Sequence, residues 1–257
     1  MVYDMKIGFT STSFRQIKST EKIVDIAADS GAQIIEWGGD IHVKNVSDAQ
    51  NVKKLCTLAG IEISSYGSYY RIGDCNASER RRVCEIASAM DCGYVRVWLG
   101  RADSEKTDEE TYKKLVGDGQ NLCAEAEKYG LKICPECHDN TYNNNTDAFL
   151  KIYNDIGCDN FGTYFQSRYR RKEYDLNRIE RTAPYIESVH ISYSEQTREQ
   201  LLKQDKTYID ALLEKIVRSG FDKNLLVEYT YLFSWCGFAG SMKKDIEKIR
   251  ARVESLK

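Results

Sequence analysis

The sequence predicts a single (β/α)8 barrel that spans residues 1–257, and three observations support this fold class. Short apolar runs alternate with longer amphipathic segments, and the alternation repeats eight times. Eight strand–helix repeats in about 250 residues are typical of this barrel, whereas a doubly wound sheet usually has fewer strands per domain. The chain has only two prolines and no Ser/Gly-rich or low-complexity tract, so we expect one domain without a linker.

The eight expected strands follow one another along the whole chain. They are MKIGFTS (5–11), AQIIEW (32–37), IEISSY (61–66), GYVRVWL (93–99), LKICPE (131–136), FGTYFQ (161–166), SVHISY (188–193) and NLLVEY (224–229). Helical segments lie between them, for example 19–31, 48–60, 77–93 and 109–130. Several of these begin at a capping residue and close on glycine, as in Ser19 to Gly31 and Ser78 to Gly93. The stretch YGSYYRIG (66–73) is expected to be a loop.

Composition narrows the class of protein. Hydrophobic residues make up 42% and charged residues 30%, which is ordinary for a soluble globular chain. Lys and Arg total 37 against 39 acidic residues, so no global positive field favours nucleic acid as a partner. No apolar stretch approaches membrane-spanning length, and the N-terminal residues lack a signal peptide's apolar block, so we expect a cytoplasmic protein with no membrane partner. The nine cysteines show no disulfide framework, and we expect reduced thiols.

The stretch KICPECH (132–138) contains a CxxC pair beside a glutamate and a histidine. In an extended strand, Cys134, Glu136 and His138 share one face, while Cys137 points to the other. A CxxC metal or redox site needs a turn or a helix N-terminus instead. We therefore interpret this stretch as a strand end whose Glu136 and His138 reach the barrel mouth.

The same alternation of faces places other polar side chains near the C-terminal ends of strands. They are Glu36, Arg96, Gln166, His190 and Glu228. Barrel active sites lie at this face, and strands buried on both sides are otherwise apolar. Buried glutamates need a cation, a proton or an arginine partner. The structural alternative is that Arg96 simply pairs with Glu36 and that His190 is a hydrogen-bonded core residue. We favour a functional cluster of Glu136, His190 and Glu228, whose ligand atoms suit Mn²⁺, Mg²⁺, Co²⁺ or Zn²⁺.

Two polar loops are candidates for substrate contact. The turn at Gly38 and Gly39 is expected to bring Asp40 and His42 over the mouth. The next loop carries an aromatic and basic group, namely Tyr66, Tyr69, Tyr70 and Arg71. Such a wall suits a sugar, which offers apolar C–H faces and many hydroxyls, although aromatic packing at the surface explains it equally well. The run RYRRK (168–172) is better explained as a solvated charge run than as a phosphate site.

From KIGFTSTSF to LLVEY the chain resembles the sugar phosphate isomerase/epimerase group of xylose isomerase-like TIM barrels, which also include endonuclease IV-type nucleases. The most specific stretches are IIEWGGDIHV, SSYGSYYRIG, VRVWLG, ECHDNTY and TYFQ. In ketose epimerases of this group, Glu, Asp, His and Glu from strands 5 to 8 hold one divalent metal. The resemblance assigns three of these roles to Glu136, His190 and Glu228. Gln166 stands in place of the Asp and adds no charge, so weaker metal affinity or a different ion is expected.

The resemblance implies an isomerase or epimerase of a sugar or sugar phosphate in carbohydrate metabolism. The expected route is a metal-stabilised cis-enediolate, with Glu136 and Glu228 as acid and base and Gln166 and His190 completing the metal ligands. The expected substrate contacts are Glu36, Asp40, His42, Tyr66, Arg96 and His138. Tyr169 stands where the family usually has a histidine. Because of this difference, a barrel that binds a sugar without catalysis is an alternative function. A nuclease is disfavoured because the chain has only three histidines. Barrels of this type often pair as homodimers, but no sequence feature fixes an interface.

Overall fold

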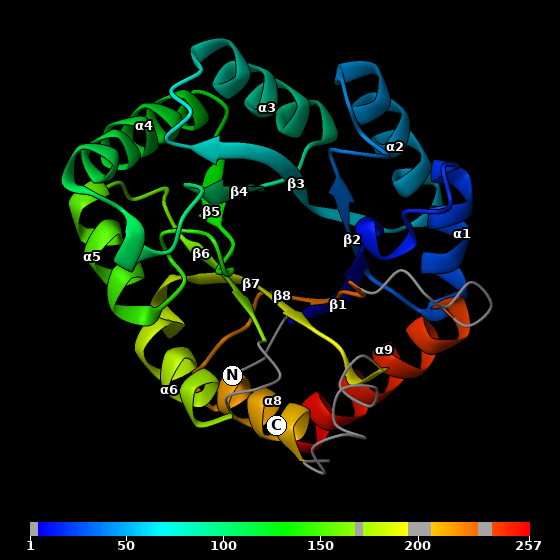
Figure 1. The fold of residues 1–257 in the computed structure, drawn as a ribbon. Coiled ribbons are helices and arrows are strands. Elements are labelled where there is room, and N and C mark those ends of the chain that lie inside the picture. The colour runs from blue at the N-terminus through cyan, green and yellow to red at the C-terminus, as the bar shows by residue number, and fades with distance from the viewer. Residues whose placement is uncertain (1–4, 168–171, 195–206, 231–237) are drawn as a thin grey trace.

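Eight parallel strands form a barrel in the computed structural model, which describes residues 5–167, 172–194, 207–230 and 238–257 (Figure 1). The strands are β1 (Lys6–Thr10), β2 (Ile34–Gly38), β3 (Glu62–Ile72), β4 (Tyr94–Leu99), β5 (Lys132–Pro135), β6 (Thr163–Gln166), β7 (Ile186–Ile191) and β8 (Asn224–Val227). Their order is β5-β4-β3-β2-β1-β8-β7-β6, and two parallel bridges, Ile133 with Phe161 and Glu136 with Tyr164, link β5 to the β6 segment. The predicted single (β/α)8 barrel is confirmed.

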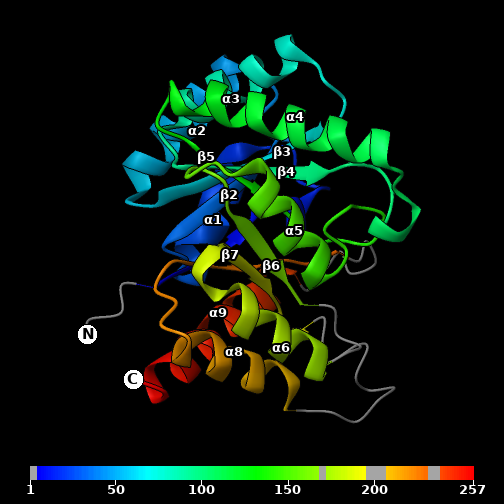
Figure 2. The same ribbon diagram turned by 90° about the vertical axis from the view of Figure 1, so that its left-hand side faces the viewer.

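Helices surround the barrel on the outside, as the two ribbon views show (Figures 1 and 2). They are α1 (Thr20–Ser30), α2 (Val46–Ala59), α3 (Ala77–Met90), α4 (Glu109–Glu127), α5 (Thr146–Ile156), α6 (Lys172–Thr182), α8 (Tyr208–Arg218) and α9 (Phe238–Ser255). The described residues also include three short 3-10 segments, η1 (Ser11–Phe14), η2 (Ser104–Lys106) and η3 (Ala183–Tyr185). Because each helix follows a strand, the connections after the strands gather at one end of the barrel.

Helix boundaries follow the capping residues, and one prediction was wrong. Helix α1 matches the expectation, because the Ser19 side chain accepts from the Lys22 amide and Gly31 adopts a left-handed φ of 71°. Helix α3 does not run from Ser78 to Gly93. The Asn76 side chain accepts from the amide of Glu79 and so starts the helix earlier, and Asp91 ends it with a φ of 61°. Asp tolerates this conformation better than most residues.

Strand β3 is longer than the sequence predicted. It continues to Ile72, so YGSYYRIG is mostly strand rather than loop. Its second half pairs with β4 through Arg71 with Trp98 and Ile72 with Leu99, after a register shift beyond Gly67. Backbone pairing with β4 therefore overrides the turn signal of the two glycines at 67 and 73.

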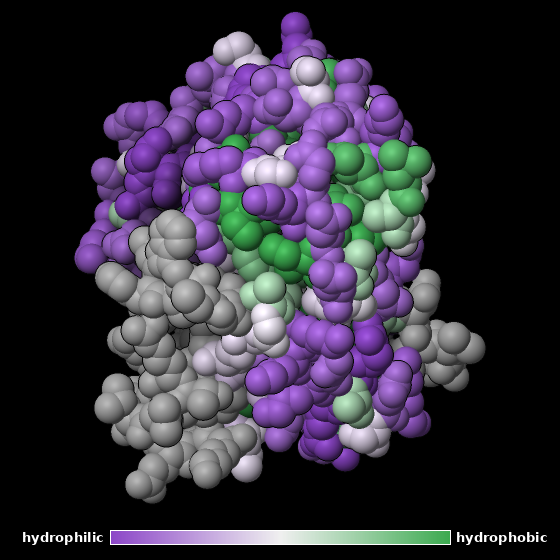
Figure 3. Space-filling model, turned by 90° about the vertical axis from the view of Figure 1, so that its right-hand side faces the viewer, coloured by the Kyte–Doolittle hydropathy of each residue, from purple (hydrophilic) through white to green (hydrophobic). Residues whose placement is uncertain are grey.

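The core lies both inside the barrel and between the barrel and its helices, where the apolar side chains of every strand are buried. The face in Figure 3 is mostly hydrophilic, with hydrophobic side chains gathered near its centre. The eight cysteines among the described residues are free thiols. Within the described ranges no helix is long and apolar enough to cross a bilayer.

Candidate functional site

The C-terminal ends of five strands bring together the side chains that the sequence singled out. Glu36 comes from β2, Arg96 from β4, Glu136 follows β5, His190 comes from β7 and Glu228 follows β8. The register fixes their level, because Arg96 pairs in the sheet with Gly67 on one side and Cys134 on the other. A Cβ atom at Gly67 would lie 2.9 Å from Arg96 Nη2 and 3.2 Å from Glu36 Oε1. Glycine at this position leaves room for the guanidinium inside the barrel.

Arg96 joins two of the glutamates. Its Nε lies 3.1 Å from Glu36 Oε1, and its Nη1 pairs with Glu136 Oε2. All three side chains are buried, and the exposed fraction of each is 3% or less. Burial alone would raise the pKa of both carboxyls, but the charges of Arg96 and His190 outweigh it and lower the pKa of Glu36 and of Glu136 to about 2. Both carboxylates are therefore ionised at neutral pH.

His190 lies between the three glutamates. Its Nδ1 is 3.3 Å from Glu228 Oε2 and 3.7 Å from Glu136 Oε1, while its Nε2 is 3.5 Å from Glu36 Oε1. Burial lowers the pKa of His190, but the negative charges of Glu228 and Glu36 dominate and raise it well above its ordinary value. Neither ring nitrogen has a hydrogen-bond partner in the part of the chain that the structure describes.

Gln166 lies beside Glu228 at the end of β6. Its side-chain amide donates from Nε2 to Glu228 Oε2 over 2.8 Å. The same carboxylate oxygen faces His190 Nδ1. Glu228 is the most exposed of the clustered carboxylates, with 12% of its side chain accessible, which places it at the opening of the site.

The cluster fits a divalent cation. Ligand atoms of Glu136, His190 and Glu228 lie within 4.8 Å of one another, so small side-chain rotations let them meet on one ion. The two unpartnered nitrogens of His190 are buried polar atoms that a ligand would satisfy. Arg96 neutralises one of the carboxylates, and two negative charges remain when the imidazole is neutral. Oxygen and imidazole donors with this charge suit Mn²⁺, Mg²⁺, Co²⁺ or Zn²⁺.

Two of the residues expected to contact a substrate are buried and make hydrogen bonds within the protein. Tyr66 is 1% exposed and its hydroxyl donates to the carbonyl of Val43, because Ser65 takes the inward face of β3 and bonds to Glu36. His42 is also buried, with Nδ1 3.0 Å from Ser11 Oγ and Nε2 2.8 Å from the Ile17 carbonyl. These placements do not support a role for Tyr66 or His42 in binding substrate. The sequence did not reveal that Ser65 rather than Tyr66 takes the inward face of β3. It also did not reveal that the loop carrying His42 packs on η1.

Asp40 and His138 lie on connections that follow strands. Asp40 is ion-paired with Arg15, whose guanidinium also donates to the Tyr69 hydroxyl. His138 is exposed and its ring stands edge to face with Trp98, with 5.1 Å between the centroids. Tyr169 and most of the RYRRK run lie outside the described residues.

Sequence reasoning missed several neighbours of the cluster. Ser65 donates to Glu36 Oε2 over 3.0 Å, and the Tyr164 ring packs edge to face on His190 at 5.2 Å. The Trp98 ring lies 5.9 Å from the Arg96 guanidinium carbon. Trp98 is two residues after Arg96 and Tyr164 two residues before Gln166, so the same alternation of faces could have found both.

The CxxC stretch forms neither a disulfide nor a metal centre among the described residues. Cys134 and Cys137 are buried and form no disulfide, and the Cys137 thiol donates to the carbonyl of Asn143 over 2.9 Å. This agrees with the interpretation of KICPECH as a strand end.

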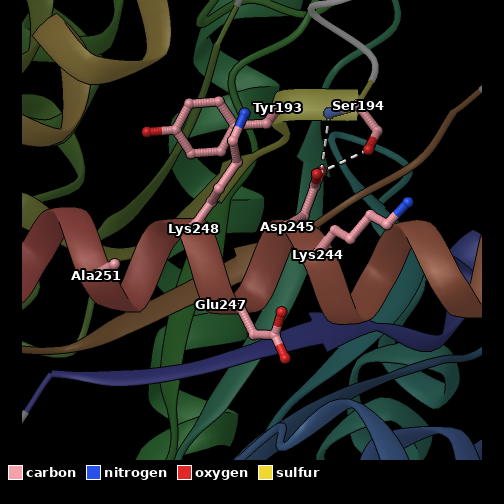
Figure 4. Close-up of a pocket in the computed structure, with 7 residues that line it drawn as sticks. All are labelled: Tyr193, Ser194, Lys244, Asp245, Glu247, Lys248 and Ala251. Carbon is pink, nitrogen blue, oxygen red and sulfur yellow. Dashed lines mark hydrogen bonds between the residues drawn. The ribbon is translucent and has the colours of Figure 1, made fainter.

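A pocket of about 430 Å³ lies away from the cluster, where the end of β7 meets α9 (Figure 4). Asp245 fixes this region, since its carboxylate accepts from the Ser192 hydroxyl and from the backbone and hydroxyl of Ser194. The Lys248 ammonium covers the Tyr193 ring at 4.7 Å. Glu36, Glu136 and Glu228 do not line this pocket, so we do not assign it to the candidate site.

Comparison with known proteins agrees with this architecture. The sequence profile of the xylose isomerase-like TIM barrel family matches residues 24–252. The chain belongs to this family. No curated protein sequence matches it significantly.

Solved structures of several enzymes share the fold at low sequence identity. A probable 3-DHS dehydratase from Bacillus anthracis superposes with a TM-score of 0.79 at 15% identity, covering 96% of this chain and 99% of that one. An L-ribulose 3-epimerase gives 0.77 at 15% identity, with 98% and 95% covered. A D-allulose 3-epimerase from Methylomonas sp., solved with D-allulose, gives 0.77 at 14% identity, with 97% and 98% covered.

Proposed function

We propose that this family member is a divalent-metal-dependent isomerase or epimerase of a sugar or sugar phosphate. The observation that carries the proposal is the convergence of Glu136, His190 and Glu228 at the C-terminal mouth of the barrel. The sugar 3-epimerases among the structural neighbours support the substrate class. A single domain over residues 1–257 and a cytoplasmic location belong to the same proposal.

In this proposal Glu136, His190 and Glu228 hold the cation, with Gln166 as a fourth, uncharged ligand if its amide turns to present oxygen. The cation supplies Lewis-acid stabilisation of the negative charge that develops on the substrate's carbonyl oxygen. Arg96 contributes a second, fixed positive charge beside Glu136. Arg96 is buried, and a cation held by these ligands would lie beside it, in a setting where electrostatic stabilisation is stronger than in water.

The glutamates of this chain would move the proton. The carboxylates of Glu136 and Glu228 arrive from neighbouring parts of the mouth and can meet a substrate carbon next to a carbonyl from two sides. Glu136 is ionised, as a proton acceptor must be, and the charges of Arg96 and His190 that lower its pKa make it a weaker base than an ordinary glutamate. Removal and return of that proton through a cis-enediolate interconverts an aldose and a ketose, or inverts the carbon.

Proton removal next to a carbonyl also begins a dehydration, and one neighbour is a probable dehydratase. The two reactions differ in product, because an isomerase conserves the mass of the substrate whereas a dehydratase loses water.

The test is a panel of aldoses, ketoses and their phosphates, incubated in D₂O with the protein and Mn²⁺, and read by mass spectrometry. We expect deuterium to enter one sugar without loss of water, and to enter at least a hundredfold more slowly with Glu228→Gln. Loss of water from the labelled product would favour the dehydratase. Saturable sugar binding without any exchange would indicate a sugar-binding barrel and refute the proposed enzyme.

A further inference from the structure

Glu36 is fully buried, and each of its carboxylate oxygens faces another polar side chain of the site. Its side chain is 0% exposed, although the sequence suggested a substrate contact. One carboxylate oxygen, Oε2, accepts from Ser65. The other, Oε1, lies 3.1 Å from Arg96 Nε and 3.5 Å from His190 Nε2. These contacts allow Glu36 to act on the site through Arg96 and His190.

We propose that Glu36 is a positioning residue that orients two ligands of the cation, His190 directly and Glu136 through Arg96. This inference rests on the proposed function. A neutral imidazole carries its proton on one nitrogen and can bind a metal only through the other. Glu36 stands at the Nε2 side of the ring, whereas Glu136 and Glu228 stand at the Nδ1 side. A proton on Nε2, where Glu36 Oε1 lies 3.5 Å away and can draw close enough to accept it, leaves the Nδ1 lone pair facing the two ligand carboxylates.

The second ligand is oriented through the guanidinium. Arg96 is held at Nε by Glu36 and pairs through Nη1 with Glu136 Oε2. This pairing leaves Glu136 Oε1 on the side of His190 Nδ1, 3.7 Å away. Glu36 thus sets both the tautomer of one ligand and the free oxygen of the other. The close approach of Gly67 leaves these groups little room to rearrange.

The tautomer is measurable because the chain has only three histidines. In protein labelled with ¹⁵N-histidine and loaded with diamagnetic Zn²⁺, His42→Gln and His138→Gln assign the remaining ring signals to His190. We expect the His190 proton on Nε2 and the metal on Nδ1. A wild-type spectrum with the proton on Nδ1 would overturn the proposal, and this measurement does not depend on any variant at position 36.

Affinity gives an independent measurement. Glu36→Gln should weaken Zn²⁺ binding, measured by calorimetry, by about 10- to 100-fold. The matched control is Glu187→Gln, which removes a buried glutamate from the same barrel, one that is paired with Lys132 and Lys223 at 2.8 Å each. The control should keep wild-type affinity even if it lowers stability. Equal Zn²⁺ affinity in Glu36→Gln and wild type would contradict the positioning role of Glu36. It would leave the proposed function of the cation site unaffected.

Failure of the metal site itself would look different. If the wild-type chain binds no Zn²⁺, the proposed function loses its cation. The metal-free spectrum then decides the role of Glu36. A slowly exchanging His190 Nε2–H that is lost in Glu36→Gln but kept in Glu187→Gln would support the positioning, and its absence from wild type would contradict it.

Discussion

Replacement of Arg96 by methionine tests whether the buried ion pairs hold the site together. The substitution keeps a long side chain in the barrel but leaves Glu36 and Glu136 buried beside each other without their arginine. Removal of one partner of a buried pair costs about 3–5 kcal/mol, because the other charge remains desolvated. We expect the free energy of unfolding of Arg96→Met to fall by that amount at pH 7.

The pKa values give a second estimate of how much the ion pairs of Arg96 contribute to the free energy of unfolding. A shift from 4.5 to about 2 corresponds to about 3 kcal/mol for one carboxylate. The total for Glu36 and Glu136 is less than twice this value because they share one arginine. Since both pKa values are lowered by folding, this stability is present above about pH 4.5 and is lost as the pH falls towards 2. In Arg96→Met burial dominates and raises both pKa values, so acidification from pH 7 to 5 should stabilise the variant.

Denaturant unfolding of both proteins between pH 4 and pH 8 provides the assay. The control is Arg82→Met, which removes a half-exposed arginine paired with Glu79 and should cost less than about 1 kcal/mol. The reasoning would be refuted if Arg96→Met lost less than about 1 kcal/mol in free energy of unfolding and if that free energy changed with pH as it does in the wild type.

Three further predictions concern the surroundings of the site. Gly67→Ala places a methyl group 2.9 Å from Arg96 Nη2. It should lower the free energy of unfolding by about 1–3 kcal/mol and weaken Mn²⁺ binding measured by calorimetry. The control Gly93→Ala, whose added methyl group meets open space, should do neither. Asp118→Ala removes the carboxylate that accepts from the buried Tyr70 hydroxyl and should cost about 1–3 kcal/mol in denaturant unfolding; an unchanged midpoint would contradict this. Burial lowers the pKa of His190 but Glu228 and Glu36 raise it more, so a bound cation must displace a proton and its affinity should increase with pH. Calorimetric titrations with the cation in buffers of different ionisation enthalpy would show the released proton. A cation affinity that does not change with pH would contradict the displacement of a proton from His190.

The fold could be predicted because its signals are local and repeated. Seven of the eight strands lie within or close to the expected ranges, since each is a short apolar run between helical segments. Strand β3 was the exception. The glycine and tyrosine stretch after Tyr66 has turn-like composition, and only its pairing with β4 makes it a strand. That partner is distant in sequence, so no local pattern reports it.

The site was predicted in part for the same reason. Alternation along one strand identifies inward residues such as Arg96 and His190, and it needs no knowledge of the neighbouring strand. The partner of each residue depends on the register between strands. Glu36 was therefore expected beside the substrate, although Ser65 and Gly67 on β3 enclose it. The contact of His42 with Ser11 is likewise one that the sequence does not indicate.

The central claim is that Glu136 and Glu228 hold one divalent cation in the mouth of this barrel. Elemental analysis of protein purified without chelator and then equilibrated with Mn²⁺ tests it most directly, with Glu136→Gln and Glu228→Gln beside the wild type. We predict about one ion per wild-type chain and loss of the ion in both variants. Wild-type protein that binds no ion, or variants that both retain it, would contradict the account.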